Sequence, residues 1–116
     1  MKNILLFASR LFIGSIFVYS GVIKIIDSQG ELGYMRMFDI PGTGVLLVVA
    51  VAVELIAGVF FIFGLRARYA GVVLILFLAL TTYIFHTNFA DPSQQVHFLK
   101  NLAIMGGLLH VTINDA

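Results

Sequence analysis

The sequence predicts an all-α integral membrane protein, a four-transmembrane-helix bundle with a short interfacial segment between helices 1 and 2. Hydrophobic residues make up 60% of the chain and charged residues only 11%, whereas a soluble domain usually carries about 25% charged residues. Four apolar segments are each long enough to cross a bilayer, which takes about 20 residues in a helix. The strand alternation of a barrel is missing, and lipid admits only helices and closed barrels as spanning structures. With 116 residues, the chain is expected to form a single transmembrane domain over residues 1–116.

The four spans are expected, in chain order, at residues 4–26, 44–65, 69–85 and 96–113. The RAR stretch at residues 66–68 forms a tight turn between the second and third spans. Residues 86–95 join the third and fourth spans, and Asp91-Pro92 marks a stop and a restart there because proline disfavours helix at the preceding residue. Residues 27–44 mix charged, aromatic and methionine side chains, which is typical of a segment lying at the lipid headgroups.

The distribution of lysine and arginine predicts that both termini lie in the cytoplasm. The basic residues on the side of the termini are Lys2, Arg10, Arg66 and Arg68. Those on the opposite side are Lys24, Arg36 and Lys100, which are accompanied there by acidic residues. The excess of basic residues on the side of the termini is small, but it predicts that this side is cytoplasmic.

Small residues mark one face of each of the first two spans. Arg10, Gly14, Phe17, Gly21 and Lys24 recur at helical spacing and therefore share a face. A second face, on the next span, carries alanines and a glycine around a carboxylate. Small residues let another helix approach closely. The sequence leaves open whether these faces pack within one bundle or between copies of the chain in a homo-oligomer.

The carboxylate on that second face is Glu54, near the middle of a span where an ionisable side chain costs roughly 2.5–3.5 kcal/mol. We expect it to face the interior of the bundle. Arg10 is the favoured partner, because its guanidinium is long and can pair through two bonds. Lys100, on the fourth span, is the rival. Arg10 and Glu54 are thus predicted to form a buried ion pair or a proton site, although Arg10 could instead extend to the headgroups.

Polar residues gather at the end of the bundle opposite the termini. The candidate ligand-binding residues there are Lys24, His86, Lys100 and Asn101, with Asn88 in the connecting loop. Such a mouth suits a small polar or anionic headgroup whose apolar tail lies between the helices. The alternative interpretation is the ordinary polar rim of a membrane protein.

Several kinds of site have no pattern in the sequence. No ligand spacing frames His86 and His97, so no metal site is predicted. The sequence contains no recognisable Ser–His–Asp arrangement or phosphate-binding loop, so no catalytic residues are predicted. The absence of cysteine excludes disulfides and thiolate chemistry, and a net charge of +1 does not indicate nucleic-acid binding.

Three stretches resemble the DoxX family of small four-helix bacterial membrane proteins: RLFIGSIFVYSGVIK, ELIAGVFFIFGLRARYA and FHTNFADPSQQVHFLKNLAIMGGLL. They occur in the family's order and cover nearly the whole chain. The positions that match the family pattern are Arg10, Gly14, Gly21, Lys24, Glu54, Gly58, His86, Lys100, Asn101, Gly106 and Gly107. The resemblance implies a multi-pass protein of the bacterial cytoplasmic (inner) membrane, in contact with lipid.

The resemblance also implies two classes of function. The family takes its name from a subunit associated with thiosulfate:quinone oxidoreductase, which suggests a membrane subunit or accessory of a quinone- or sulfur-linked redox system. More distant relatives resemble chaperones or cargo receptors, which suggests a non-catalytic assembly factor. A small proton-coupled transporter using Glu54 is a third candidate, because four helices, a short chain and one membrane glutamate also resemble the small multidrug exporters. No intrinsic cofactor is expected, and any redox reaction would need a bound quinone and a redox partner protein.

Overall fold

The structure, a computed structural model, describes residues 2–86 and 90–114. These residues form five helices and no strand. The helices are α1 (Lys2–Ile26), α2 (Ser28–Arg36), α3 (Thr43–Phe63), α4 (Ala67–Phe85) and α5 (Pro92–Asn114). All except α2 are long and apolar enough to cross a membrane. The predicted fold class, with four spans and a short segment between the first two, is therefore confirmed.

The ends of the helices follow local rules that the sequence already contains. The largest difference from expectation is at α5, which begins at Pro92 rather than at residue 96. Asp91 explains the earlier start, because its side chain accepts a hydrogen bond from the backbone N–H of Ser93 at 3.0 Å. An aspartate cap followed by proline is a favoured helix start. Asp27 caps α2 in a similar way, by accepting from the backbone N–H of Gly30 at 3.3 Å.

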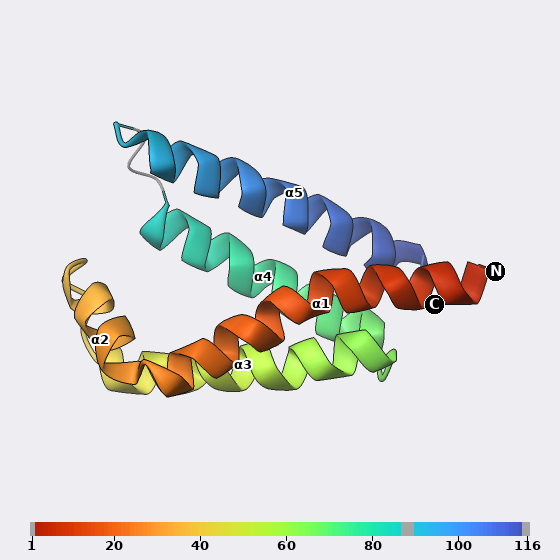
Figure 1. Ribbon diagram of the computed structural model, residues 1–116, viewed down its shortest axis with the longest axis horizontal. Helices are drawn as coiled ribbons and strands as arrows, with labels where there is room; N and C mark the ends of the chain where they lie inside the picture. Colours follow the sequence, from red (N-terminus) through yellow and green to blue (C-terminus); the bar gives the residue numbers. More distant parts are fainter. Residues whose placement is uncertain (1, 87–89, 115–116) are drawn as a thin grey trace.

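The long helices lie in two pairs, with α1 beside α3 and α4 beside α5 (Figure 1). Both chain ends lie at one end of the bundle, which we call the terminal end. The short helix α2 lies at the other, which we call the α2 end. Figure 1 shows that the α4–α5 pair diverges from the α1–α3 pair toward the α2 end.

The α1–α3 contact depends on glycine. A Cβ atom at Gly14 would lie 2.5 Å from Cγ1 of Ile62 and 3.3 Å from the backbone oxygen of Gly58. Neither distance leaves room for a side chain. The small-residue face predicted on the first span thus permits the close approach of a second helix, as expected.

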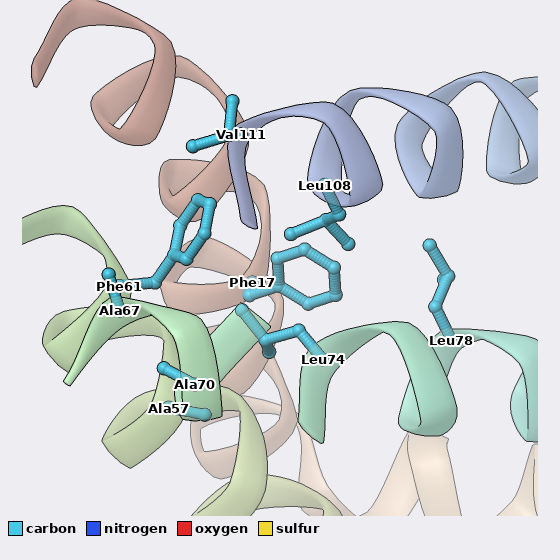
Figure 2. Close-up of a cluster of buried hydrophobic side chains, with 9 residues drawn as sticks. All are labelled: Phe17, Ala57, Phe61, Ala67, Ala70, Leu74, Leu78, Leu108 and Val111. Carbon is cyan, nitrogen blue, oxygen red and sulfur yellow. The ribbon is translucent and has the colours of Figure 1, made fainter. Parts of the chain in front are cut away.

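The apolar core joins all four long helices (Figure 2). Its buried members are Phe17, Ala57, Phe61, Ala67, Ala70, Leu74, Leu78, Leu108 and Val111. Most of these residues belong to the terminal halves of their helices. The core therefore closes the bundle from its middle to the terminal end, and the diverging helices at the α2 end are left without a comparable apolar core.

Candidate functional site

A cavity of about 410 Å³ occupies the α2 end of the bundle. All five helices contribute to its wall, which is mostly apolar. Its polar and charged lining residues are Ser20, Lys24, Glu31, Tyr34, Glu54, Thr81, His86 and Asn101. A volume of this size and a mainly apolar wall with a few polar groups are typical of sites for small molecules.

Glu54 lies in the wall of this cavity and pairs with Lys24. The Nζ atom of Lys24 lies 2.7 Å from Oε1 of Glu54, and Glu54 is only 3% exposed. Lys24 also donates to the Ser20 hydroxyl at 2.7 Å. Among the described residues, Lys24 is the partner of Oε1, and this oxygen accepts no further hydrogen bond. A carboxylate oxygen with remaining acceptor capacity therefore belongs to the cavity wall.

The predicted pairing of Glu54 with Arg10 is wrong. Nε of Arg10 donates to the backbone oxygen of Ile62 at 3.4 Å, and its guanidinium lies beside Gly64. Gly64 is ten residues beyond Glu54, which is about 15 Å along a helix. Arg10 thus lies at the C-terminal end of α3, where a cation interacts favourably with exposed carbonyls.

Side-chain direction explains why Lys24 is the partner. Helical side chains lean toward the N-terminus of their own helix. Since α1 and α3 run in opposite directions, Lys24 leans back from the α2 end while Glu54 leans toward it. The two groups therefore meet between their Cα positions. The same lean turns Arg10 away from Glu54, so it favours Lys24 over Arg10 without fixing how deep α1 packs on α3.

The predicted ligand-binding residues divide between the cavity and the surface. Lys24, His86 and Asn101 all line the cavity, although they come from three different parts of the chain. Nδ2 of Asn101 donates to the hydroxyl of the buried Thr82 at 2.9 Å. Lys100 is exposed on α5 and is not part of the cavity wall. Asn88 lies outside the described residues.

His86 lies at the C-terminal end of α4, on the rim of the cavity. Its Nδ1 atom lies 2.7 Å from Oε1 of Gln94, so the protonated nitrogen donates to this amide oxygen. The ring of His97 stacks on that of His86, with centroids 5.0 Å apart. In residues 2–86 and 90–114, no group of three or more histidine, cysteine, aspartate or glutamate side chains could hold a metal ion.

An aromatic cluster covers the cavity at the α2 end, and the sequence did not predict it. Tyr34 stacks on Phe85 with centroids 5.4 Å apart, and Phe38 meets the same ring edge-on at 4.9 Å. Tyr34 also hydrogen-bonds to the Gln94 side chain. Burial raises the pKa of Tyr34 above its ordinary value of 10.0, Glu31 adds to this increase, and the Gln94 hydrogen bond opposes it.

Fold and cavity together define a class: a small helical membrane protein with four spans and a ligand-sized cavity at one end. The chain belongs to the DoxX family, whose family model matches residues 5–87. The resemblance noted in the sequence is thus confirmed, although this match ends before the fourth span.

Two proteins of Escherichia coli (strain K12) are similar to the chain. Inner membrane protein YqjF is 29% identical over 113 residues, covering 97% of this chain and 85% of the relative. Inner membrane protein YphA is 27% identical over 117 residues, covering 97% and 84% respectively. No solved structure matches the chain. The family and these relatives, together with the four apolar helices, identify a multi-pass inner membrane protein.

Proposed function

We propose that this protein is a membrane subunit or accessory of a redox system and that it binds a quinone in the cavity at the α2 end. The observation that carries the proposal is a mainly apolar cavity of about 410 Å³ with hydrogen-bonding side chains on three separate elements. The family resemblance to a subunit associated with a quinone-linked enzyme supports the same ligand.

The donor set suits a quinone. A quinone ring is flat and apolar, and its two carbonyl oxygens accept hydrogen bonds from different directions. Lys24 on α1 and Asn101 on α5 are donors in the wall, and His86 at the end of α4, whose Nδ1–H is used on Gln94, offers its Nε2 as an acceptor to the hydroxyl of the reduced quinol. The Asn101 amide has two N–H groups and uses one of them on Thr82, so the other is available to a ligand.

When bound, a quinone supplies two-electron, two-proton redox chemistry. The residues of this chain would hold the ring and its carbonyl oxygens and keep water away from them. Glu54 would orient Lys24 through their ion pair in the wall. Because the chain has no cysteine, electrons would pass between the quinone and a redox partner protein.

The test measures quinone that co-purifies with the full chain after mild extraction, by solvent extraction and mass spectrometry. His86→Ala should lower the retained quinone by about two- to tenfold, as expected for a hydrogen bond worth roughly 0.5–1.5 kcal/mol. The matched control is His97→Ala, because His97 stacks on His86 but is exposed and outside the cavity wall. Lys100→Ala is a second control, and both controls should retain quinone like the wild type.

Two outcomes would contradict the proposal. Equal losses in the His86 and His97 variants would show that the cavity does not bind the quinone. If the wild type retained no quinone at all, a non-catalytic assembly factor would become the better interpretation.

A second candidate function is proton-coupled transport through Glu54. The observation that favours it is the burial of this carboxylate in the wall of a cavity within the spans, since ionisable residues inside membranes commonly mark proton pathways. Its distinguishing result would be uptake into vesicles, driven by a proton gradient, that Glu54→Gln abolishes without unfolding the protein.

A further inference from the structure

The cavity is covered on the side of the headgroups. Tyr34 and Phe38 pack on Phe85 of α4, and Tyr34 and His86 both hydrogen-bond to Gln94 near the start of α5. These contacts tie α2 and the turn after it to the ends of α4 and α5. A ligand arriving from water would have to separate them.

The wall between α3 and α4 is different. Leu46, Val49 and Leu80 line the cavity, yet they are 42%, 51% and 60% exposed. Exposed side chains in the wall indicate where the cavity meets the outside of the bundle. Ile16 on α1 also lines the cavity and is 44% exposed, so three of these four aliphatic side chains belong to α3 and α4. The cavity is therefore open to the outside along the diverging α2-side halves of α3 and α4.

This opening lies at the depth of the hydrocarbon core. Val49 is six residues into α3 from Thr43, or about 9 Å along the helix. Leu80 is five residues before Phe85, the last residue of α4, or about 7.5 Å. In a four-span inner membrane protein, outward-facing side chains at this depth contact lipid tails.

We propose that the cavity takes its ligand laterally from the bilayer through this opening, and that the ligand is a lipid-soluble molecule whose hydrocarbon tail lies between α3 and α4. The polar head would lie at the Lys24–Glu54 pair in the cavity wall. The inference rests on the proposed function in placing the ligand in this cavity. A tailed quinone and a membrane phospholipid share the required chemistry.

The first experiment asks whether lipid tails reach the cavity. The chain has no tryptophan, so a single introduced tryptophan reports its own surroundings by fluorescence. Phe17→Trp places the reporter in the cavity wall, and Phe61→Trp places it in the core away from the cavity. In vesicles of phospholipid brominated on the acyl chain, bromine should quench the Phe17→Trp variant strongly and the Phe61→Trp variant weakly. Equal quenching of the two would overturn the inference.

The second experiment closes the opening. Val49→Phe adds bulk to a residue at the opening, and Val48→Phe adds the same bulk to its exposed neighbour outside the cavity wall. In the Phe17→Trp background, Val49→Phe should remove most of the quenching and Val48→Phe should leave it unchanged. Unchanged quenching in both would show that the opening is not between α3 and α4. If Phe17→Trp does not fold, Phe77→Trp, which also lines the cavity, carries the same comparison.

Quinone retention in the same variants distinguishes a quinone tail from a phospholipid tail in the cavity. Val49→Phe should lower retained quinone and Val48→Phe should not. Bromine quenching without retained quinone would uphold lateral access for a phospholipid tail and contradict the proposed function. Retained quinone without bromine quenching would uphold the proposed function and contradict lateral access.

Discussion

At the scale of single residues, the most consequential feature is the Lys24–Glu54 pair. A buried ion pair offers little net stability over an apolar pair, but removing one partner is costly because a charge is left buried without its counter-charge. The two partners differ here, since Lys24 is nearer a helix end and partly exposed while Glu54 is almost fully buried. A lone Lys24 can extend toward the headgroups, whereas a lone Glu54 cannot reach water.

This asymmetry predicts unequal losses of stability. Lys24→Met should destabilise the protein by about 3–5 kcal/mol, the range for breaking a buried pair, and Glu54→Gln should destabilise it less. The double variant should lose less than the sum of the single losses, because the two residues are in contact. Thermal unfolding in detergent would measure all three variants.

Arg10 supplies the control for this cycle. Arg10→Gln combined with Glu54→Gln should give additive losses, since Arg10 lies at the other end of α3. Coupling between Arg10 and Glu54, with none between Lys24 and Glu54, would contradict the observed pairing.

At the scale of elements, α2 covers the cavity on the side of the headgroups. The segment between the first two spans was expected to lie at the headgroups. It forms a capped helix whose Tyr34 contacts both Phe85 and Gln94. Partial burial of this phenol favours its neutral form, so the docking of α2 is linked to a protonated Tyr34.

The raised pKa of Tyr34 predicts an alkaline limit for the docking of α2. Because the folded pKa is above the ordinary value of 10.0, the contribution of Tyr34 is complete below that value and is lost as pH rises through the folded pKa. The ultraviolet titration difference between the wild type and Tyr34→Phe would give this pKa. Glu31→Gln should lower it without returning it to its ordinary value, because burial is the larger cause. A Tyr34 that titrates at or below its ordinary value would refute the docked position of α2.

At the scale of the whole molecule, the bundle is closed at one end and hollow at the other. The core residues of Figure 2 close the middle and the terminal end, and the cavity lies at the α2 end. Since both chain ends lie at the terminal end (Figure 1), orientation in the membrane decides which side the cavity faces. We infer from the lysine and arginine distribution that the termini are cytoplasmic and that the cavity lies on the non-cytoplasmic side.

Reporter fusions at the C-terminus would test this orientation. A fluorescent protein that matures in the cytoplasm should be bright, and an alkaline phosphatase that is active only outside should be inactive. Replacing Arg66 and Arg68 by glutamine should increase the inverted fraction, because these residues supply charge on the inner side. The same change at Arg36 and Lys100 should not. Active phosphatase on the wild-type chain would reverse the assignment.

The sequence by itself determined the four spans, the turn between α3 and α4 and the family. Segment length, hydropathy and the caps at Asp27 and Asp91 depend only on residues close in the sequence. The predicted helix ends therefore lie within a few residues of the observed ones. The gathering of Lys24, His86 and Asn101 at one end was also predictable, because their depth follows from their positions in the spans.

Only the tertiary structure decided which basic residue meets Glu54 and what surrounds it. The depth at which α1 packs on α3 depends on the fit of Ile62 and Gly58 against Gly14, and this contact brings Lys24 to Glu54 and Arg10 to the end of α3. The divergence of the helix pairs likewise results from a core confined to the middle and the terminal end. The cavity, its aromatic cover and its opening between α3 and α4 exist only because the helices are arranged in this way.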